Sequence, residues 1–100
     1  MAVVEVSITP LGTGEPGVSR FVADCVRIAR ESGLSHQLTP MGTIIEGELD
    51  SILGLIRRMH EAPFNAGATR VSTLIKIDDR RDVQSHTMTG KVSSVESRLR

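Results

Sequence analysis

Three glycines at positions 12, 14 and 17 form the pattern G-x-G-x-x-G, a spacing that can cradle phosphate groups. Such a loop would place a pyrophosphate on backbone N–H groups at the start of a helix. Pro16 removes one of those donors, because proline has no backbone N–H. The next strand-like segment ends in His36, Gln37 and Thr39 with no acid to hold a ribose, and 100 residues are too few for a doubly wound dinucleotide fold. We therefore interpret residues 10–17 as a loop over a ligand pocket.

The nucleophilic and metal-binding residue types form no recognisable catalytic or metal pattern. Cys25 lies on an apolar helical stripe, where a small buried side chain is the ordinary role. The three histidines are far apart and show no i,i+4 metal pairing, so no metal site is predicted. Ser7, His36 and Asp78 would supply a nucleophile, a base and an acid, but no nucleophile elbow supports that set. The sequence predicts a protein that is not an enzyme.

Two periodicities predict the elements that position these residues. Period-two alternation predicts strands at residues 2–9, 34–39, 43–47 and 68–78, with Pro40-Met41-Gly42 as the turn of a hairpin. Helical spacing predicts one helix from Ser19 to shortly before Gly33 and another over 49–62, which Pro63 ends. The order β-α-β-β-α-β is that of the ferredoxin-like sandwich, an α+β fold with a four-stranded antiparallel sheet.

The core of this fold should contain the inward stripe of each helix. On the second helix Leu53 and His60 are expected to face inward, together with Leu49, Ile52, Ile56 and Met59. Both phenylalanines, Phe21 and Phe64, are also expected in the core. No ring then remains to stack on a nucleobase, so nucleic-acid binding is disfavoured.

Residues 83–100 form an extension beyond this plan. Met88, Val92, Val95 and Leu99 recur as an apolar seam, which predicts an extra C-terminal helix. Isolated helices below about 12–15 residues are marginal in water, so we expect this one to dock on its own sheet or on a neighbour's. Residues 1–100 are interpreted as a single domain with this helical extension.

Because both helices cover one side of the sheet, its other side is left open. This open face should carry Val3, Glu5, Ser7 and Thr9, then Ser35, Gln37 and Thr39, then Ile44 and Glu46, and then Ser72, Leu74, Lys76 and Asp78. Its mixed polarity fits a sheet-on-sheet dimer with a polar pocket. It equally fits a solvated antiparallel sheet face, and both interpretations stay open.

The composition disfavours several classes of protein. Twelve basic and twelve acidic residues balance, so no net field attracts nucleic acid or a membrane surface. No apolar stretch approaches the roughly 20 residues of a membrane span, and residues 1–9 lack the features of a signal peptide. The single cysteine cannot form an internal disulfide. We expect a cytoplasmic protein with no metal and no cofactor.

Four segments together resemble the small thiamine-binding protein family over essentially the whole chain. They are EVSITPLG at 5–12, TPMGTIIEG at 39–47, RVSTLIKIDDR at 70–80 and MTGKVSSV at 88–95. The resemblance implies a ferredoxin-like subunit that pairs through its sheet as a homodimer or homotetramer. It also implies binding of thiamine or its hydroxymethylpyrimidine moiety at an oligomer interface, without known catalysis.

An aminopyrimidine offers an amine donor and ring-nitrogen acceptors, which hydroxyls, a carboxylate and an apolar wall can recognise. Under the resemblance, Glu46 would accept from the amine, and Met41 or Ile44 would cover the ring. Ser7, Thr39 and Thr43 would complete the polar edge. Each of these six residues would otherwise be a surface or dimer contact. The alternative function is a regulatory or structural interaction subunit with no small-molecule ligand; a small enzyme is a third.

Overall fold

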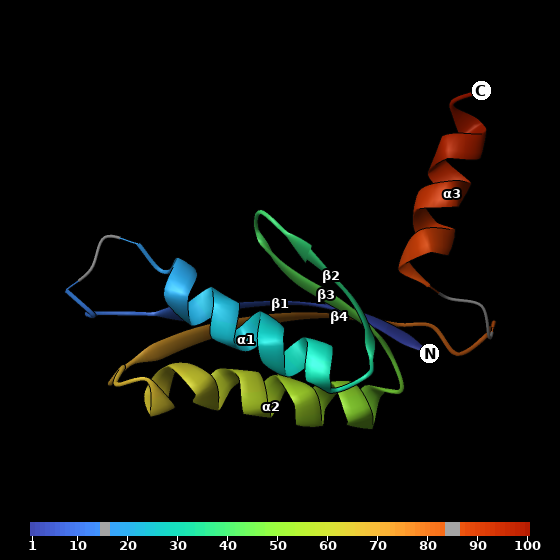
Figure 1. Cartoon of the computed structure of the whole chain (residues 1–100). Coiled ribbons are helices and arrows are strands. Elements are labelled where there is room, and N and C mark those ends of the chain that lie inside the picture. The colour runs from blue at the N-terminus through green and yellow to red at the C-terminus, as the bar shows by residue number, and fades with distance from the viewer. Residues whose placement is uncertain (15–16, 84–86) are drawn as a thin grey trace.

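The computed structural model describes residues 1–14, 17–83 and 87–100 and confirms the predicted ferredoxin-like α+β fold. The strands are β1 (Ala2–Pro10), β2 (Ser35–Thr39), β3 (Gly42–Gly47) and β4 (Val71–Asp79). The helices are α1 (Ser19–Glu31), α2 (Leu49–Asn65) and α3 (Met88–Arg98). All neighbouring strands are antiparallel, in the order β2-β3-β1-β4. Figure 1 shows α1 and α2 together on one side of this sheet.

Strand alternation divides the sheet into a core face and the open face. Val4, Val6 and Ile45 are almost completely buried on the side of the helices. The register places Val3 opposite Glu46 and Glu5 opposite Ile44, so these four side chains share the other face. This is the open face predicted from the sequence.

The helix α2 runs through Pro63 to Asn65, so the prediction that Pro63 ends it was wrong. Proline has no N–H to donate to the carbonyl four residues earlier, which belongs to Met59. The Cys25 thiol of α1 donates to that carbonyl instead, with Sγ and the oxygen 3.4 Å apart. The neighbouring helix thus replaces the donor that the proline lacks, and Cys25 acquires a structural role.

Two predicted core positions of α2 are also wrong. Leu53 is 38% exposed, and Leu55 is buried in its place beside Ile52 and Ile56. Phe64 is 37% exposed, and its ring meets the ring of His60 edge-on, with centroids 5.5 Å apart. Both exposed residues lie beside the buried stripe of α2, which consists of Ile52, Leu55, Ile56, Met59, Ala62 and Pro63.

The extra helix α3 is present as predicted, but none of its residues is buried. Figure 1 shows it standing away from the sheet, with only its first turn near the other elements. Among the described segments, no helix has the length and apolar character needed to cross a membrane.

Candidate ligand site at the hairpin tip

The end of β1 has a neighbouring strand on only one side. Pairing between β1 and β4 continues to Pro10 opposite Val71, whereas pairing between β1 and β3 ends at Val6 opposite Thr43. Beyond that point the β2–β3 hairpin separates from β1, and Figure 1 shows its tip standing clear of the sheet. A space therefore opens between the hairpin, β1 and the start of α1.

This space is a hollow of about 280 Å³, which we call the hairpin hollow. Its apolar walls come from β1, β2, α2 and the beginning of α1 with the residue before it: Val6, Ile8, Val18, Val22, Leu38 and Met59. Its polar and turn-forming lining consists of Ser7, Thr9, Thr39, Pro40, Met41, Gly42 and Thr43. Pockets for small molecules begin near about 300 Å³ and combine apolar walls with a few polar groups. The hairpin hollow thus has the size and lining for a small ring.

The shape of the hollow depends on a tight turn at the hairpin tip. The Thr39 hydroxyl donates to the Gly42 carbonyl at 2.9 Å and accepts from the Met41 N–H at 3.3 Å. A Cβ added at Gly42 would lie 2.7 Å from the Val6 carbonyl oxygen, so only glycine allows the two backbones to approach this closely. Thr39 therefore holds the turn, and its hydroxyl is already hydrogen bonded.

Thr43 is the one polar side chain among the described residues that is classed as buried, with 5% of its surface exposed. It lies on the core side of β3 and lines the hairpin hollow. Within the described part of the chain, its hydroxyl forms no hydrogen bond. Buried hydroxyls nearly always have a partner, in the protein, in solvent or in a ligand. This group is therefore the strongest candidate for a polar ligand contact.

The structure thus brings together four of the six residues predicted from the sequence: Ser7, Thr39, Met41 and Thr43. Ile44 and Glu46 are not among the residues that line the hairpin hollow, and they lie on the opposite side of β3 from Thr43. The sequence did not identify the apolar wall of Val18, Val22 and Met59. Val22 and Met59 lie on helical core stripes, and the stripe pattern cannot distinguish the open end of a core from its middle.

Ile44 and Glu46 lie where α3 meets the open face. Ile44 lines a second, smaller hollow of about 150 Å³, together with Lys91 of α3. The Glu46 carboxylate accepts a hydrogen bond from the Met88 N–H at 2.8 Å, at the beginning of α3. A carboxylate is favourable at this end of a helix. Glu46 therefore holds the helix rather than a group in the hairpin hollow.

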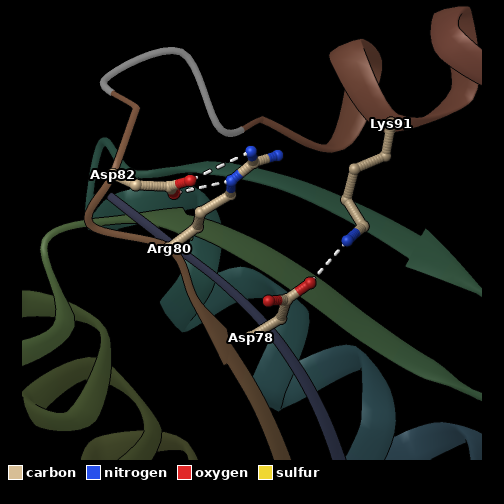
Figure 2. Close-up of polar contacts among 4 residues, drawn as sticks. All are labelled: Asp78, Arg80, Asp82 and Lys91. Atoms are coloured by element: carbon tan, nitrogen blue, oxygen red, sulfur yellow. Dashed lines mark hydrogen bonds and ion pairs between the residues drawn. The ribbon is translucent and has the colours of Figure 1, made fainter.

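A second carboxylate reinforces this attachment. Figure 2 shows Lys91 of α3 paired with Asp78 of β4, while Arg80 pairs with Asp82 in the segment that follows. The hydrogen bonds that Arg80 donates to Asp82 raise the pKa of its guanidinium group. Asp78 and Glu46 together attach the first turn of α3 to the open face, and the rest of the helix projects outward.

Burial of the Cys25 thiol disfavours its reactive, deprotonated form. Desolvation by burial, with a smaller contribution from nearby Asp24, raises the pKa of Cys25 to about 11. The thiol is therefore protonated near neutral pH, and only the thiolate is reactive.

Ser7 and His36 lie on opposite faces of the sheet, so the residues of the hypothetical catalytic set are not brought together. Within residues 1–14, 17–83 and 87–100, no cluster of three His, Cys, Asp or Glu side chains could hold a metal.

The sequence of this chain matches a family of known proteins. A sequence model described as thiamine-binding protein matches residues 4–96. The UPF0045 protein YqgV of Bacillus subtilis is 47% identical over 103 residues, covering 99% of this chain and 98% of its own. The UPF0045 protein of Methanothermobacter thermautotrophicus is 36% identical and covers 99% and 100%.

Solved structures agree with these sequence matches. Hypothetical protein MJ1052 of Methanocaldococcus jannaschii superposes with a TM-score of 0.86 and 35% identity, over 95% of both chains. Protein TM0486 of Thermotoga maritima, assigned provisionally to thiamine biosynthesis or salvage, gives a TM-score of 0.79 over 94% of this chain and 97% of its own. Its identity is 18%, so this second likeness concerns the fold alone.

Proposed function

Because the chain belongs to the thiamine-binding protein family, we propose that it binds thiamine or its hydroxymethylpyrimidine moiety in the hairpin hollow, without catalysing a reaction. One observation carries the proposal. In a chain of this family, four of the six residues predicted from the sequence to contact an aminopyrimidine line a single hollow of suitable size. Small-ligand sites commonly combine such apolar walls with a few placed hydroxyls.

The lining of the hollow suits the pyrimidine better than the charged thiazolium ring. Val18, Val22 and Met59 offer apolar surface to the faces of a flat ring, and the exposed Met41 can cover its outer side. Among the described residues, no charged side chain lines the hollow. A cation there would lose hydration without gaining a counter-charge. We therefore propose that thiamine binds with its pyrimidine inside and its thiazolium toward solvent.

Calorimetric titration of the full chain with thiamine and with hydroxymethylpyrimidine tests this function. Saturable heat with one site per chain is the expected result. Val18→Phe should abolish the heat, because Val18 is half-buried at the wall and a larger ring would fill the hollow. The matched control is Val83→Phe, at an exposed valine outside the hollow. Flat traces with both ligands for the unmodified chain would contradict the proposal.

We also propose that the chain is a homo-oligomer that covers its open face and α3 with a second copy. Val92, Val95 and Leu99 of the α3 seam are more than half exposed, and Leu74 is exposed on the open face. The open face carries Glu5 and Lys76 on paired strands. In a twofold-symmetric dimer that pairs two open faces, the acidic side chains of one chain can therefore lie opposite the basic side chains of the other. The same exposed seam favours the second candidate function, an interaction subunit with no small-molecule ligand.

The proposed setting is the cytoplasm. The chain has a single cysteine, which is buried and unpaired with another thiol. Proteins of oxidising compartments more often use cysteine in disulfides.

A further inference from the structure

Beyond Val6, the edge of β1 that faces the hairpin has no strand partner and borders the hairpin hollow. The Val6 carbonyl faces β3, since a Cβ on Gly42 would lie 2.7 Å from its oxygen. In an antiparallel strand, the N–H and C=O of one residue point to the same side, and every second residue points that way. The N–H and C=O of Ile8 therefore also face the hairpin.

The ladder between β1 and β3 does not reach Ile8. Its last pair is Val6 opposite Thr43, and the turn residue Met41 donates its N–H to Thr39 instead. Ile8 lines the hairpin hollow, as does Thr43. One donor and one acceptor of the main chain thus face the same space as the buried hydroxyl of Thr43. Backbone polar groups in such a place require a partner from solvent or from a ligand.

We infer that the hairpin hollow recognises a flat, uncharged heteroaromatic ring through an adjacent donor and acceptor on one edge of that ring. The ring acceptor takes the Ile8 N–H, the ring donor gives to the Ile8 C=O, and the Thr43 hydroxyl supplies a further hydrogen bond. The ligand edge therefore pairs with Ile8 at a position that the β1–β3 ladder does not reach. This inference rests on the proposed function and specifies how the site distinguishes its ligand.

An aminopyrimidine has the required edge, because its amine donor is next to a ring-nitrogen acceptor. The recognition needs no charged side chain, in agreement with the uncharged lining of the described residues. It also needs no aromatic side chain, since backbone groups fix the plane of the ring and the aliphatic walls cover its faces. Backbone groups that line the hollow disfavour a ligand whose donor and acceptor are reversed, because such a ligand would leave them unpaired.

The first test compares hydroxymethylpyrimidine with the analogue in which an oxo group replaces the amine. Replacement turns the donor into an acceptor while the ring keeps its size. Calorimetry should show at least about tenfold weaker binding of the oxo analogue, as expected for a mismatched buried hydrogen bond. Equal affinity of the two compounds would overturn the inference and leave the proposed function intact. If neither compound nor thiamine binds, the proposed function itself fails, and the inference with it.

The second test follows the Ile8 amide by hydrogen exchange measured with NMR. Without ligand, the Ile8 N–H should exchange much faster than the Val6 N–H, which lies within the paired ladder. Saturating hydroxymethylpyrimidine should slow exchange at Ile8 and leave Val6 unchanged. An Ile8 amide whose exchange does not respond to the bound ligand would overturn the inference.

A variant addresses the hydroxyl. Thr43→Val keeps the shape of the side chain and removes only the buried oxygen, so the chain should fold and bind the pyrimidine several-fold more weakly. Thr69→Val, at an exposed threonine outside the hollow, is the matched control and should bind normally. Unchanged affinity of Thr43→Val would overturn the role of this hydroxyl.

Discussion

At the scale of single residues, Cys25, Met59 and Pro63 form a unit that joins the two helices. The Met59 carbonyl accepts from the Cys25 thiol because Pro63 cannot supply the intrahelical donor. Cys25→Ala should lower the free energy of unfolding by about 1–3 kcal/mol, through a lost contact and an unsatisfied carbonyl. Urea denaturation followed by circular dichroism would measure this loss.

A second substitution isolates the hydrogen bond from the packing. Pro63→Ala restores an N–H that can reach the Met59 carbonyl, so Cys25→Ala should cost less in that background. The double-mutant cycle should therefore show a coupling between the two sites. Strictly additive losses would mean that the thiol contributes only its volume.

The same thiol predicts a dependence of stability on pH. Its pKa is raised from 9.0 to about 11 in the folded chain, so the folded state holds this proton more tightly than the unfolded state. Its contribution to stability is complete below about pH 9 and is lost as the pH rises toward 11. The free energy of unfolding should fall over this interval less steeply in Cys25→Ala than in the unmodified chain. Parallel curves would contradict this assignment.

At the scale of elements, Glu46 determines how α3 begins. Its carboxylate holds the Met88 N–H, and it does not line the hairpin hollow. Glu46→Ala should speed hydrogen exchange at the Met88 amide, while Glu46→Gln, which keeps an acceptor, should have a smaller effect. Glu61→Ala, at an exposed glutamate of α2, is the control. The affinity for the pyrimidine should not change in Glu46→Ala. A large loss of affinity would instead show that Glu46 contributes to ligand binding.

The sequence predicted most of these elements, because period-two and helical apolar patterns are strong in this chain. It located Ile44 and Glu46 on the open face, since strand alternation fixes the face once the register is known. It failed at Pro63, where a cysteine 38 residues away in the chain supplies a compensating hydrogen bond that no local pattern reveals. It grouped Thr43 with Glu46 as ligand contacts, whereas the folded sheet places these two residues on opposite faces of β3.

The position of the hollow could not be predicted from the sequence, for a different reason. The hollow exists because the β1–β3 ladder stops at Val6 while the β1–β4 ladder continues to Pro10. The length of the β1–β3 ladder depends on how the hairpin bends in the folded sheet. The residue types at positions 7–10 are therefore not enough to predict it. The hydroxyl-bearing residues could be named from the sequence, but their common space could not.

At the scale of the whole molecule, the apolar seam of α3 is exposed in the single chain, and the proposed homo-oligomer would cover it. The chain extends 47 Å along its longest axis, and Figure 1 shows α3 projecting beyond the sheet at one end. A helix of 11 residues without buried side chains is short for independent stability, since isolated helices below about 12–15 residues are marginal. We therefore expect light scattering at micromolar concentration to give a multiple of the 10.8 kDa chain mass.

Substitution within the seam tests which surface holds the copies together. Val95→Asp places a charge in the seam and should reduce the assembled mass, whereas Ser93→Asp adds the same charge outside the seam residues and should not. Removing all residues after Asp82 should have an effect at least as large, with the core of β1 to β4 intact. If the full chain scatters as a monomer, the proposed oligomer is excluded. If the full chain and Val95→Asp assemble to the same mass, the contact between the copies lies outside the seam. A charge buried in the seam without a partner would weaken that contact.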